Sequence, residues 1–536
     1  MVLVSKLAKN FWGQTPRNES PNDFRYAKIA LLIVFPPPRP IFPTNLMTSS
    51  HPSAQRLKSQ YATDVARRTF LTRSFAGIGG LALASLTGSA ASGVSPTANS
   101  PQGDAPWPAL AGLPHFAPKA KRIVHLCMAG GPSHVESLDP KPELDRIDGQ
   151  PFPSSFTQGQ QLAQLQGSEL KARKSFVKFK KWGESGLEMS ELFPHTGAMA
   201  DELCVIRSMT TEQINHDTAH AFMNTGSIIK GRPCMGSWLL YGLGAETENL
   251  PGYVVMTSSG PGAQPVSARQ WSAGILPSRY QGIAFQASGS PVHYIGNPDG
   301  VCQSTQRQVI DEVQRLNGML AERYLDPEID TRISQYEMAF KMQTAVPELT
   351  DMSTETQDTL DAYGVKRPGD GSYASNCLLA RRLLERGVRF VQLYHRGWDH
   401  HSNLEKNFPI SARDTDRPTA ALLADLKRSG LLEDTLVLWG GEFGRTPMAQ
   451  GSGRDHHINA FSVWMAGGGV KPGMTYGATD ELGYNSVDNI VTVHDLHATL
   501  LHLFGVEHER LTARFQGLDL RLTGVEPSRV VKDILV

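Results

Sequence analysis

The chain has little cysteine, no excess of charge of either sign and no long apolar run. Its five cysteines are scattered over 536 residues without C-x-x-C spacing, which argues against a zinc ribbon and leaves at most two disulfides. Lys and Arg number 52, as do Asp and Glu, so no net field favours nucleic acid. The apolar run from Ile29 to Phe35 is too short to cross a bilayer. We therefore expect a globular protein with no nucleic-acid partner and no stable membrane span.

The N-terminal part contains a segment typical of twin-arginine export signals. In residues 66–91, Arg67 and Arg68 precede the residues TFL and a weakly apolar stretch rich in glycine and alanine. The alternative is an amphipathic helix that starts with two arginines. Because the segment before the arginine pair is unusually long for such a signal, we expect translation to start at Met47.

The composition divides the chain into three predicted parts. Residues 1–91 form an N-terminal extension with the twin-arginine signal peptide, and residues 92–118 form a flexible linker rich in Ser, Pro, Gly and Ala. Residues 119–536 form the remaining domain, which is long enough for a large core. The signal predicts export in folded form, to the periplasm or another extracytoplasmic space.

Apolar segments with strand and helix periodicity alternate along this domain, most regularly in residues 377–504. Alternating elements indicate a mainly parallel sheet with helices on both faces. The fold class we predict is therefore α/β, a three-layer α/β/α sandwich. The expected strands are 122–128, 203–208, 253–256, 282–287, 388–395, 435–439 and 461–466, and the expected helices are 306–324, 330–343, 377–385, 419–429 and 491–504.

Acidic and histidine residues gather after several of these strands. One group is Asp399, His400 and His401, and the other is Asp455, His456 and His457. Carboxylates and neutral imidazoles at strand ends are suitable ligands for divalent metal ions. In an extended segment, Asp399 and His401 point to the same side. The alternative is a pair of solvated loops in which histidines happen to be adjacent.

Further candidates follow the other strands. Glu442 is either a metal ligand or the structural partner of Arg445, and Arg445 alternatively holds a substrate oxyanion through its planar guanidinium. The segment GGPSHVESLDPK brings His134, Glu136 and Asp139 near the end of the first strand. One of them, for which we choose Glu136, is a candidate ligand, and the others serve a turn. His216 and His220 are four residues apart, and therefore on one face if this segment is helical.

The order of these motifs is similar to that of the alkaline phosphatase/sulfatase superfamily. More closely, the chain resembles the exported bacterial proteins grouped as domain-of-unknown-function family 1501, over roughly residues 121–505. The residues that carry the resemblance are the twin-arginine leader, GGPSHVESLDPKP (Gly130 to Pro142), NHDTAHAFMNTG (Asn215 to Gly226), WDHHSN (Trp398 to Asn403), GGEFGRTP (Gly440 to Pro447), GRDHH and AGGGVKPG.

The superfamily resemblance implies an alkaline-phosphatase-like fold, a pair of divalent ions and a nucleophile at a helix N-terminus. Asp399 and His401 match its ligands for one ion, Glu442 matches a ligand of the second, and His456 or His457 matches a late histidine. The nucleophile position falls on His216 and an arginine position on His220. No Cys or Ser stands there, so ordinary sulfatase chemistry is not expected. A Ser/Thr phosphatase nucleophile is not expected either, unless Thr210 or Thr218 takes that place.

The leading interpretation is a metal-dependent hydrolase acting on a small-molecule or polysaccharide ester of phosphate or sulfate. One or two divalent ions, with Zn, Mn and Ca as candidates, would activate the ester. His216 would act as nucleophile, base or ligand, and Arg445 would neutralise the charge that develops on the ester oxygens. The alternative is a non-catalytic exported binding or assembly protein that keeps the fold, because fold does not imply activity.

Overall fold

The computed structural model describes residues 108–258, 265–286, 289, 291–292, 296–297, 300–324 and 327–536. All of them belong to the unit Gln102–Val536. The predicted export signal, the start at Met47 and most of the predicted linker lie outside the described residues. Within the described part of the chain, no helix combines the length and apolarity needed to span a membrane. All five cysteines are described, and all are free thiols.

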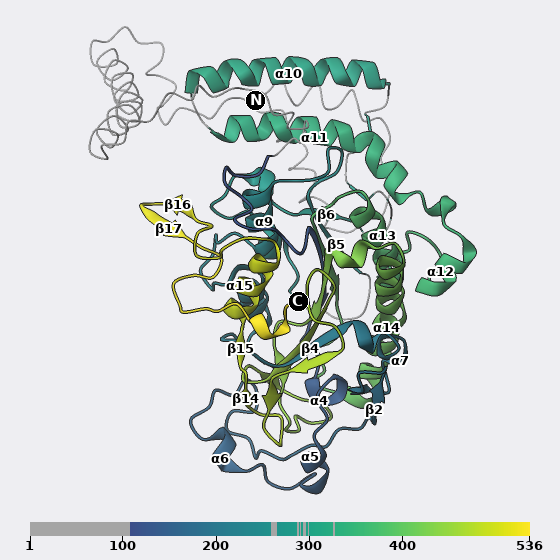
Figure 1. Ribbon diagram of the computed structural model, residues 1–536, viewed down its shortest axis with the longest axis vertical. Coiled ribbons are helices and arrows are strands. Elements are labelled where there is room, and N and C mark those ends of the chain that lie inside the picture. The colour runs from purple at the N-terminus through teal and green to yellow at the C-terminus, as the bar shows by residue number, and fades with distance from the viewer. Residues whose placement is uncertain are drawn as a thin grey trace, which may run out of the picture. The chain divides into compact units, whose positions relative to one another are not determined.

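A nine-stranded sheet forms the centre of the domain (Figure 1). Strand β11 is antiparallel to both of its neighbours, and the other strand pairs in this sheet are parallel. The order is β12 (Met474–Tyr476), β4 (Leu203–Thr210), β11 (Phe461–Ala466), β8 (Thr435–Gly440), β1 (Arg122–Met128), β7 (Phe390–His395), β5 (Tyr253–Thr257) and β6 (Ile283–Phe285), with β15 (Val491–Thr492) also paired to β4. The predicted mainly parallel sheet is confirmed.

The central strands are buried along almost their whole length. In β1, the apolar run from Ile123 to Met128 is inaccessible to solvent, and β7 and β8 are buried at every position. Strands covered on both faces are expected to read as continuous apolar runs rather than as alternating ones. The register places Leu126 of β1 between Leu393 of β7 and Trp439 of β8.

Helices cover both faces of the sheet, which confirms the predicted three layers (Figure 1). Helices α13 and α14 pack together on one side, and α9 and α15 lie on the other. Helix α8 contacts α15 through His494 and His497, which bind carbonyls of Gly226 and Met223. The bounds are α8 (His216–Thr225), α9 (Met235–Leu243), α12 (Gln357–Tyr363), α13 (Tyr373–Glu385), α14 (Leu404–Arg428) and α15 (Val493–Leu503).

Helix α14 is much longer than the predicted helix 419–429. It runs from Leu404 to Arg428 and contains Pro409 and Pro418. Proline removes a backbone donor and usually ends a helix, so a helix beginning after Pro418 was the expected outcome. Packing of the buried face against α13 and α7 (Pro194–Gly197) keeps this helix continuous.

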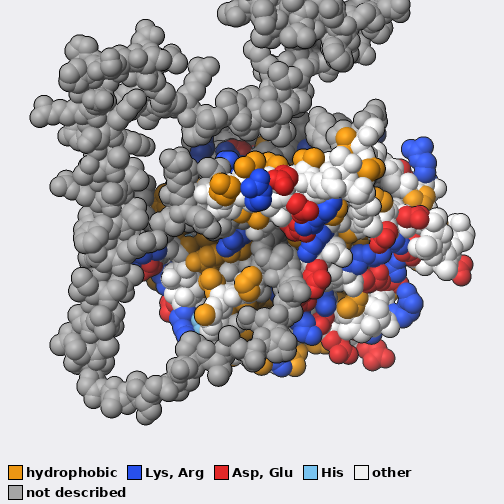
Figure 2. Space-filling view, turned by 90° about the horizontal axis from the view of Figure 1, so that it is seen from above, with side chains coloured by type: hydrophobic (Ala, Val, Ile, Leu, Met, Phe, Trp, Pro, Cys, Tyr) orange, Lys and Arg blue, Asp and Glu red, His pale blue; other side chains and the backbone are white. Residues whose placement is uncertain are grey.

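Two long helices and several small elements complete the domain. Helices α10 (Gln303–Tyr324) and α11 (Pro327–Thr350) were both predicted from their periodicity, and they lie side by side (Figure 1). On the face shown in Figure 2, basic and acidic side chains are interspersed. The remaining elements are α4 (His134–Ser137), α5 (Pro142–Arg146), α6 (Ser154–Thr157) and the strand pairs β2 (Phe179–Trp182) with β3 (Leu187–Ser190), β9 (Gly444–Arg445) with β10 (His456–His457), β13 (Ala478–Thr479) with β14 (Ser486–Asp488), and β16 (Ala513–Phe515) with β17 (Leu518–Leu520).

Candidate metal centre

Polar residues from distant parts of the chain meet at one edge of the sheet. Parallel strands β1, β4, β7 and β8 all end at this edge, and Gly130, His216, Asp399 and Glu442 follow them in that order. Strand β11 runs the opposite way and begins at the same edge, which brings in His456 from the segment just before it. The carboxyl edge of an open α/β sheet is where ligands usually bind.

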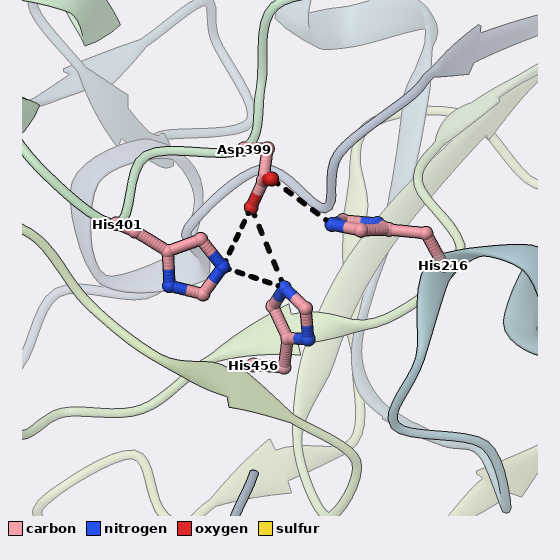
Figure 3. A group of neighbouring side chains, drawn as sticks. All are labelled: His216, Asp399, His401 and His456. Carbon is pink, nitrogen blue, oxygen red and sulfur yellow. Dashed lines mark hydrogen bonds and ion pairs between the residues drawn. The ribbon is translucent and has the colours of Figure 1, made fainter. Parts of the chain in front are cut away.

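Four side chains at this edge form what we call the outer cluster: His216, Asp399, His401 and His456 (Figure 3). Asp399 lies at its centre. Its Oδ2 is 3.2 Å from His216 Nε2, and its Oδ1 is 3.0 Å from His401 Nε2 and 3.4 Å from His456 Nε2. One ligand atom from each residue lies within 4.8 Å of the others. This is a spacing at which a single ion can be held.

A second group, the inner cluster, consists of His216, His220 and Glu442. Glu442 Oε1 is 2.6 Å from His216 Nδ1 and 3.2 Å from His220 Nε2. The side chains of His220 and Glu442 are both completely buried. His216 therefore belongs to both clusters, with its two ring nitrogens facing opposite ways.

Helix α8 and the loop after β1 position the inner cluster. His216 and His220 are one helical turn apart, and their rings are stacked with centroids 6.4 Å apart. Gly130 N donates to both oxygens of Glu442, at 3.0 and 3.1 Å. Gly130 has a φ of +122°, and a Cβ there would lie 2.3 Å from Asp399 N. Only glycine therefore fits where this loop crosses the segment that carries Asp399.

Hydrogen bonds fix the orientation of the ligands from outside. His456 Nδ1 is 2.8 Å from the carbonyl oxygen of Ile214, and His401 Nδ1 contacts Gln450 Oε1. Such partners hold a metal-binding imidazole in one tautomer and one orientation. Gln450 and Ile214 carry no signal in the sequence that would have identified them, because their role depends on tertiary packing.

The carboxylates are strongly stabilised in their charged form. Burial acts to raise the pKa of Asp399, but its hydrogen bonds with the surrounding imidazoles hold that pKa well below its usual range. Burial likewise opposes ionisation of Glu442, but His220 and His216 lower its pKa to about 2. For His216, burial would lower the pKa, yet Asp399 and Glu442 together raise it to about 9.

The imidazoles also meet the requirements of a metal site. Burial lowers the pKa of His220 and of His456, which favours the neutral form that binds metals. Both ring nitrogens of His220 are buried and make no hydrogen bond, and His216 Nε2 has an ion-pair contact with Asp399 Oδ2 at 3.2 Å. Buried polar atoms are normally satisfied, so these nitrogens fit a bound cation that would complete their coordination.

Two predicted ligands lie outside both clusters because other groups occupy their carboxylates. Glu136 forms a fully buried, two-point ion pair with Arg454, with Nη2–Oε1 at 2.6 Å and Nε–Oε2 at 2.9 Å. Asp455 Oδ2 accepts backbone hydrogen bonds from Gln164 and Leu165, at 2.7 and 2.8 Å. These two carboxylates bind an arginine side chain and two backbone amides, respectively.

Two predicted histidine ligands also point away from the clusters. His400 is 4% exposed and its ring packs against Trp398 and Phe408. His457 is 1% exposed, and its Nε2 contacts the carbonyl oxygen of Tyr484. Burial lowers the pKa of each to about 3. In both adjacent pairs, one histidine reaches the outer cluster and the other enters the core.

Arg445 and His220, both predicted to be catalytic, are buried in the structure. Arg445 is 1% exposed, and its guanidinium donates to carbonyl oxygens of Gly130, Gly131 and Arg454. Its Nη2 also donates to Asp399 Oδ1 at 2.6 Å. Arg445 thus orients Asp399, and four of its five N–H groups donate to these partners. The side chain of His220 has no exposed surface, and its Nε2 faces Glu442 within the inner cluster.

The fold and the site together define a layered α/β protein with a candidate metal centre at the carboxyl edge of its sheet. Comparison with known proteins shows the family. The model of the family described as "Protein of unknown function (DUF1501)" matches residues 120–535, so the chain belongs to this family, as its motifs predicted. A search of curated proteins found no match.

Among solved structures, the chain is similar to a sulfatase, PsFucS1 from Pseudoalteromonas sp., with 14% identity over 75% of this chain and 71% of that one, and a TM-score of 0.31. It is also similar to a protein in the alkaline phosphatase superfamily from Vibrio parahaemolyticus, with 11% identity over 74% of this chain and 69% of that one, and a TM-score of 0.32. The chain is also similar to the alkaline phosphatase from the Antarctic bacterium TAB5, with 12% identity over 67% of this chain and 94% of that one, and a TM-score of 0.25.

Proposed function

We propose that the protein is a metal-dependent hydrolase of phosphate or sulfate esters, with the outer cluster as its active site. The observation that carries this proposal is the convergence of three imidazoles and one carboxylate at a place that solvent reaches. The side chains of His401 and Asp399 are 22% and 23% exposed. Catalytic metal sites keep an open position for water or substrate, whereas structural sites are closed.

The donor set indicates which metal would bind. His216, Asp399, His401 and His456 offer three nitrogens and a carboxylate, which suits zinc or a similar transition metal better than calcium, an ion that takes oxygen ligands. When bound, such an ion supplies a Lewis acid for the ester oxygen and can lower the pKa of water to about 7.

The chain's own residues prepare this site and leave attack to water. Arg445 holds Asp399, and Glu442 holds His216, so both ligands are fixed before a substrate arrives. The hydroxyl of Thr218 donates to the carbonyl oxygen of Asn215 at 3.0 Å, which supports water rather than Thr218 as the attacking group.

The experiment is an assay of the metal-loaded protein with aryl phosphates, aryl sulfates and phosphodiesters. We expect turnover of at least one ester, and a loss of about 100-fold or more in Asp399→Asn and His401→Ala. His195→Gln, at an exposed position remote from the clusters in the sequence, serves as the matched control. Absence of turnover with every ester would instead favour an exported binding or assembly protein.

Export is a separate part of the proposal. The motif with Arg67 and Arg68 supports transport of the folded protein by the twin-arginine pathway, with residues 1–91 as leader, 92–118 as linker and 119–536 as the exported domain. Replacing both arginines by lysine should leave the precursor in the cytoplasm. Unchanged secretion of this double variant would contradict the assignment.

A further inference from the structure

The inner cluster combines a buried charge with unpartnered nitrogens. Glu442 and His220 have no exposed side-chain surface. Among the described residues, the ion-pair partners of Glu442 are His216 and His220, and no Lys or Arg lies within ion-pair distance of it. Both ring nitrogens of His220 lack a hydrogen bond, although Nε2 is only 3.2 Å from Glu442 Oε1. A carboxylate and an imidazole held this close, without donating to each other, are arranged as ligands of a common cation.

His216 belongs to this group and also to the outer cluster, where its ring faces Asp399 (Figure 3). Its Nδ1 is 2.6 Å from Glu442 Oε1, and its Nε2 is 3.2 Å from Asp399 Oδ2. Each nitrogen therefore faces a different cluster. His216 is the only residue that the two clusters share. An imidazole that has lost both ring protons offers one lone pair at each nitrogen.

We propose that His216 is a bridging ligand between two divalent ions, with Nε2 in the outer cluster and Nδ1, together with His220 and Glu442, on a second, buried ion. The inference rests on the proposed function for the outer ion, and its new element is that the two ions share one imidazole. Metal–nitrogen bonds of about 2 Å on each side of the ring place the two ions about 6 Å apart.

This spacing assigns the two ions different tasks. Ions that clamp one reacting group from both sides are about 3.5–4 Å apart, so a pair separated by an imidazole does not share the ester. The inner ion, enclosed by His220 and Glu442, instead fixes His216 and adds positive charge behind the outer site. With both nitrogens bound, His216 has no lone pair left for nucleophilic attack or proton transfer.

The first test is metal content by mass spectrometry on the mature folded protein purified without chelator. We expect about two ions per chain in the natural protein and about one in His220→Gln. His497→Gln is the matched control, because His497 is also fully buried but binds the carbonyl oxygen of Met223. One ion in both the natural protein and His220→Gln would overturn the proposal.

The second test detects the bridge itself. In the protein loaded with Cu²⁺, two ions joined by one imidazole couple magnetically, so the electron paramagnetic resonance signal should integrate to far fewer than two independent spins. His220→Gln should restore the signal of one isolated ion. Two uncoupled ions would overturn the bridge.

These results separate the inference from the proposed function. Two coupled ions in a protein that hydrolyses no ester would retain the bridge and reject the hydrolase. Ester hydrolysis by a protein with a single ion in the outer cluster would retain the hydrolase and reject the bridge.

Discussion

At the scale of single residues, the protonation of His216 decides how the centre takes up metal. Without an ion, the ring lies between the carboxylates of Asp399 and Glu442, and these raise its pKa to about 9 despite the opposing effect of burial. The cationic ring then compensates part of the negative charge. Since a metal ligand must be unprotonated, an arriving ion has to displace this proton.

We predict that binding of Zn²⁺ at pH 7.5 releases about one proton or more per chain and weakens as the pH falls below 9. The sign follows from the raised pKa: the proton on His216 stabilises the metal-free fold fully below pH 6.5, and this contribution is lost as the pH rises through about 9. Titration calorimetry in buffers of different ionisation enthalpy measures the number of protons. Release of no proton would mean that His216 is neutral before the metal binds.

The adjacent histidines His400 and His401 allow a matched pair of substitutions. We predict that His401→Ala weakens metal binding by more than about 100-fold with little loss of stability, because His401 is partly exposed in the outer cluster. His400→Ala should leave metal affinity nearly unchanged but lower the free energy of unfolding by about 2–4 kcal/mol, since it empties a buried position. Chelator competition and urea unfolding measure the two quantities, and an exchange of the two phenotypes would contradict the assignment.

At the scale of elements, the centre depends on loops that approach each other more closely than side chains allow. The loop between β1 and α4 crosses the segment after β7 at Gly130, whose amide also donates to Glu442. A single glycine thus sets the distance between the two carboxylates. The metal centre therefore depends on Gly130 in the loop between β1 and α4 as well as on the ligands themselves.

Gly130→Ala should therefore disturb both stability and metal binding. The added Cβ would lie 2.3 Å from Asp399 N and 2.6 Å from Trp398 C, and the φ of +122° is unfavourable for alanine. We expect a loss of about 3 kcal/mol or more in unfolding free energy, with weaker metal binding. Gly149→Ala is the control, because its φ is also positive at +74° but its Cβ meets open space. Equal effects of the two substitutions on metal affinity would contradict this role of Gly130.

The elements also show which parts of the site the sequence could predict. Asp399, His401 and Glu442 follow strands of the central sheet and His456 precedes one, so the pattern of strand ends predicted all of them near one edge. The alternation of an extended segment favours Asp399 with His401, and the structure agrees. Whether another candidate side chain reaches a cluster depends on partners far along the chain. Arg454, which binds Glu136, lies 318 residues from it. Local patterns do not contain such pairings.

At the scale of the whole molecule, the centre joins segments that the chain order separates widely. His216 and Glu442, for example, are 226 residues apart and meet at 2.6 Å. In the unfolded chain these ligands are dispersed, so an ion binds mainly to the folded state. Metal binding is therefore expected to stabilise the fold by mass action.

We predict that removing the metal lowers the melting temperature by several degrees. At a free-ion concentration about 1,000 times the Kd, the linkage contributes about 4 kcal/mol, and because a domain of this size has a large unfolding entropy, the shift per kcal/mol is small. Differential scanning calorimetry before and after EDTA treatment measures it, and added Zn²⁺ should restore the original value. His401→Ala should show a much smaller difference, because it lacks an outer ligand. A melting temperature that EDTA leaves unchanged in the metal-loaded natural protein would show that the clusters do not hold an ion across these segments.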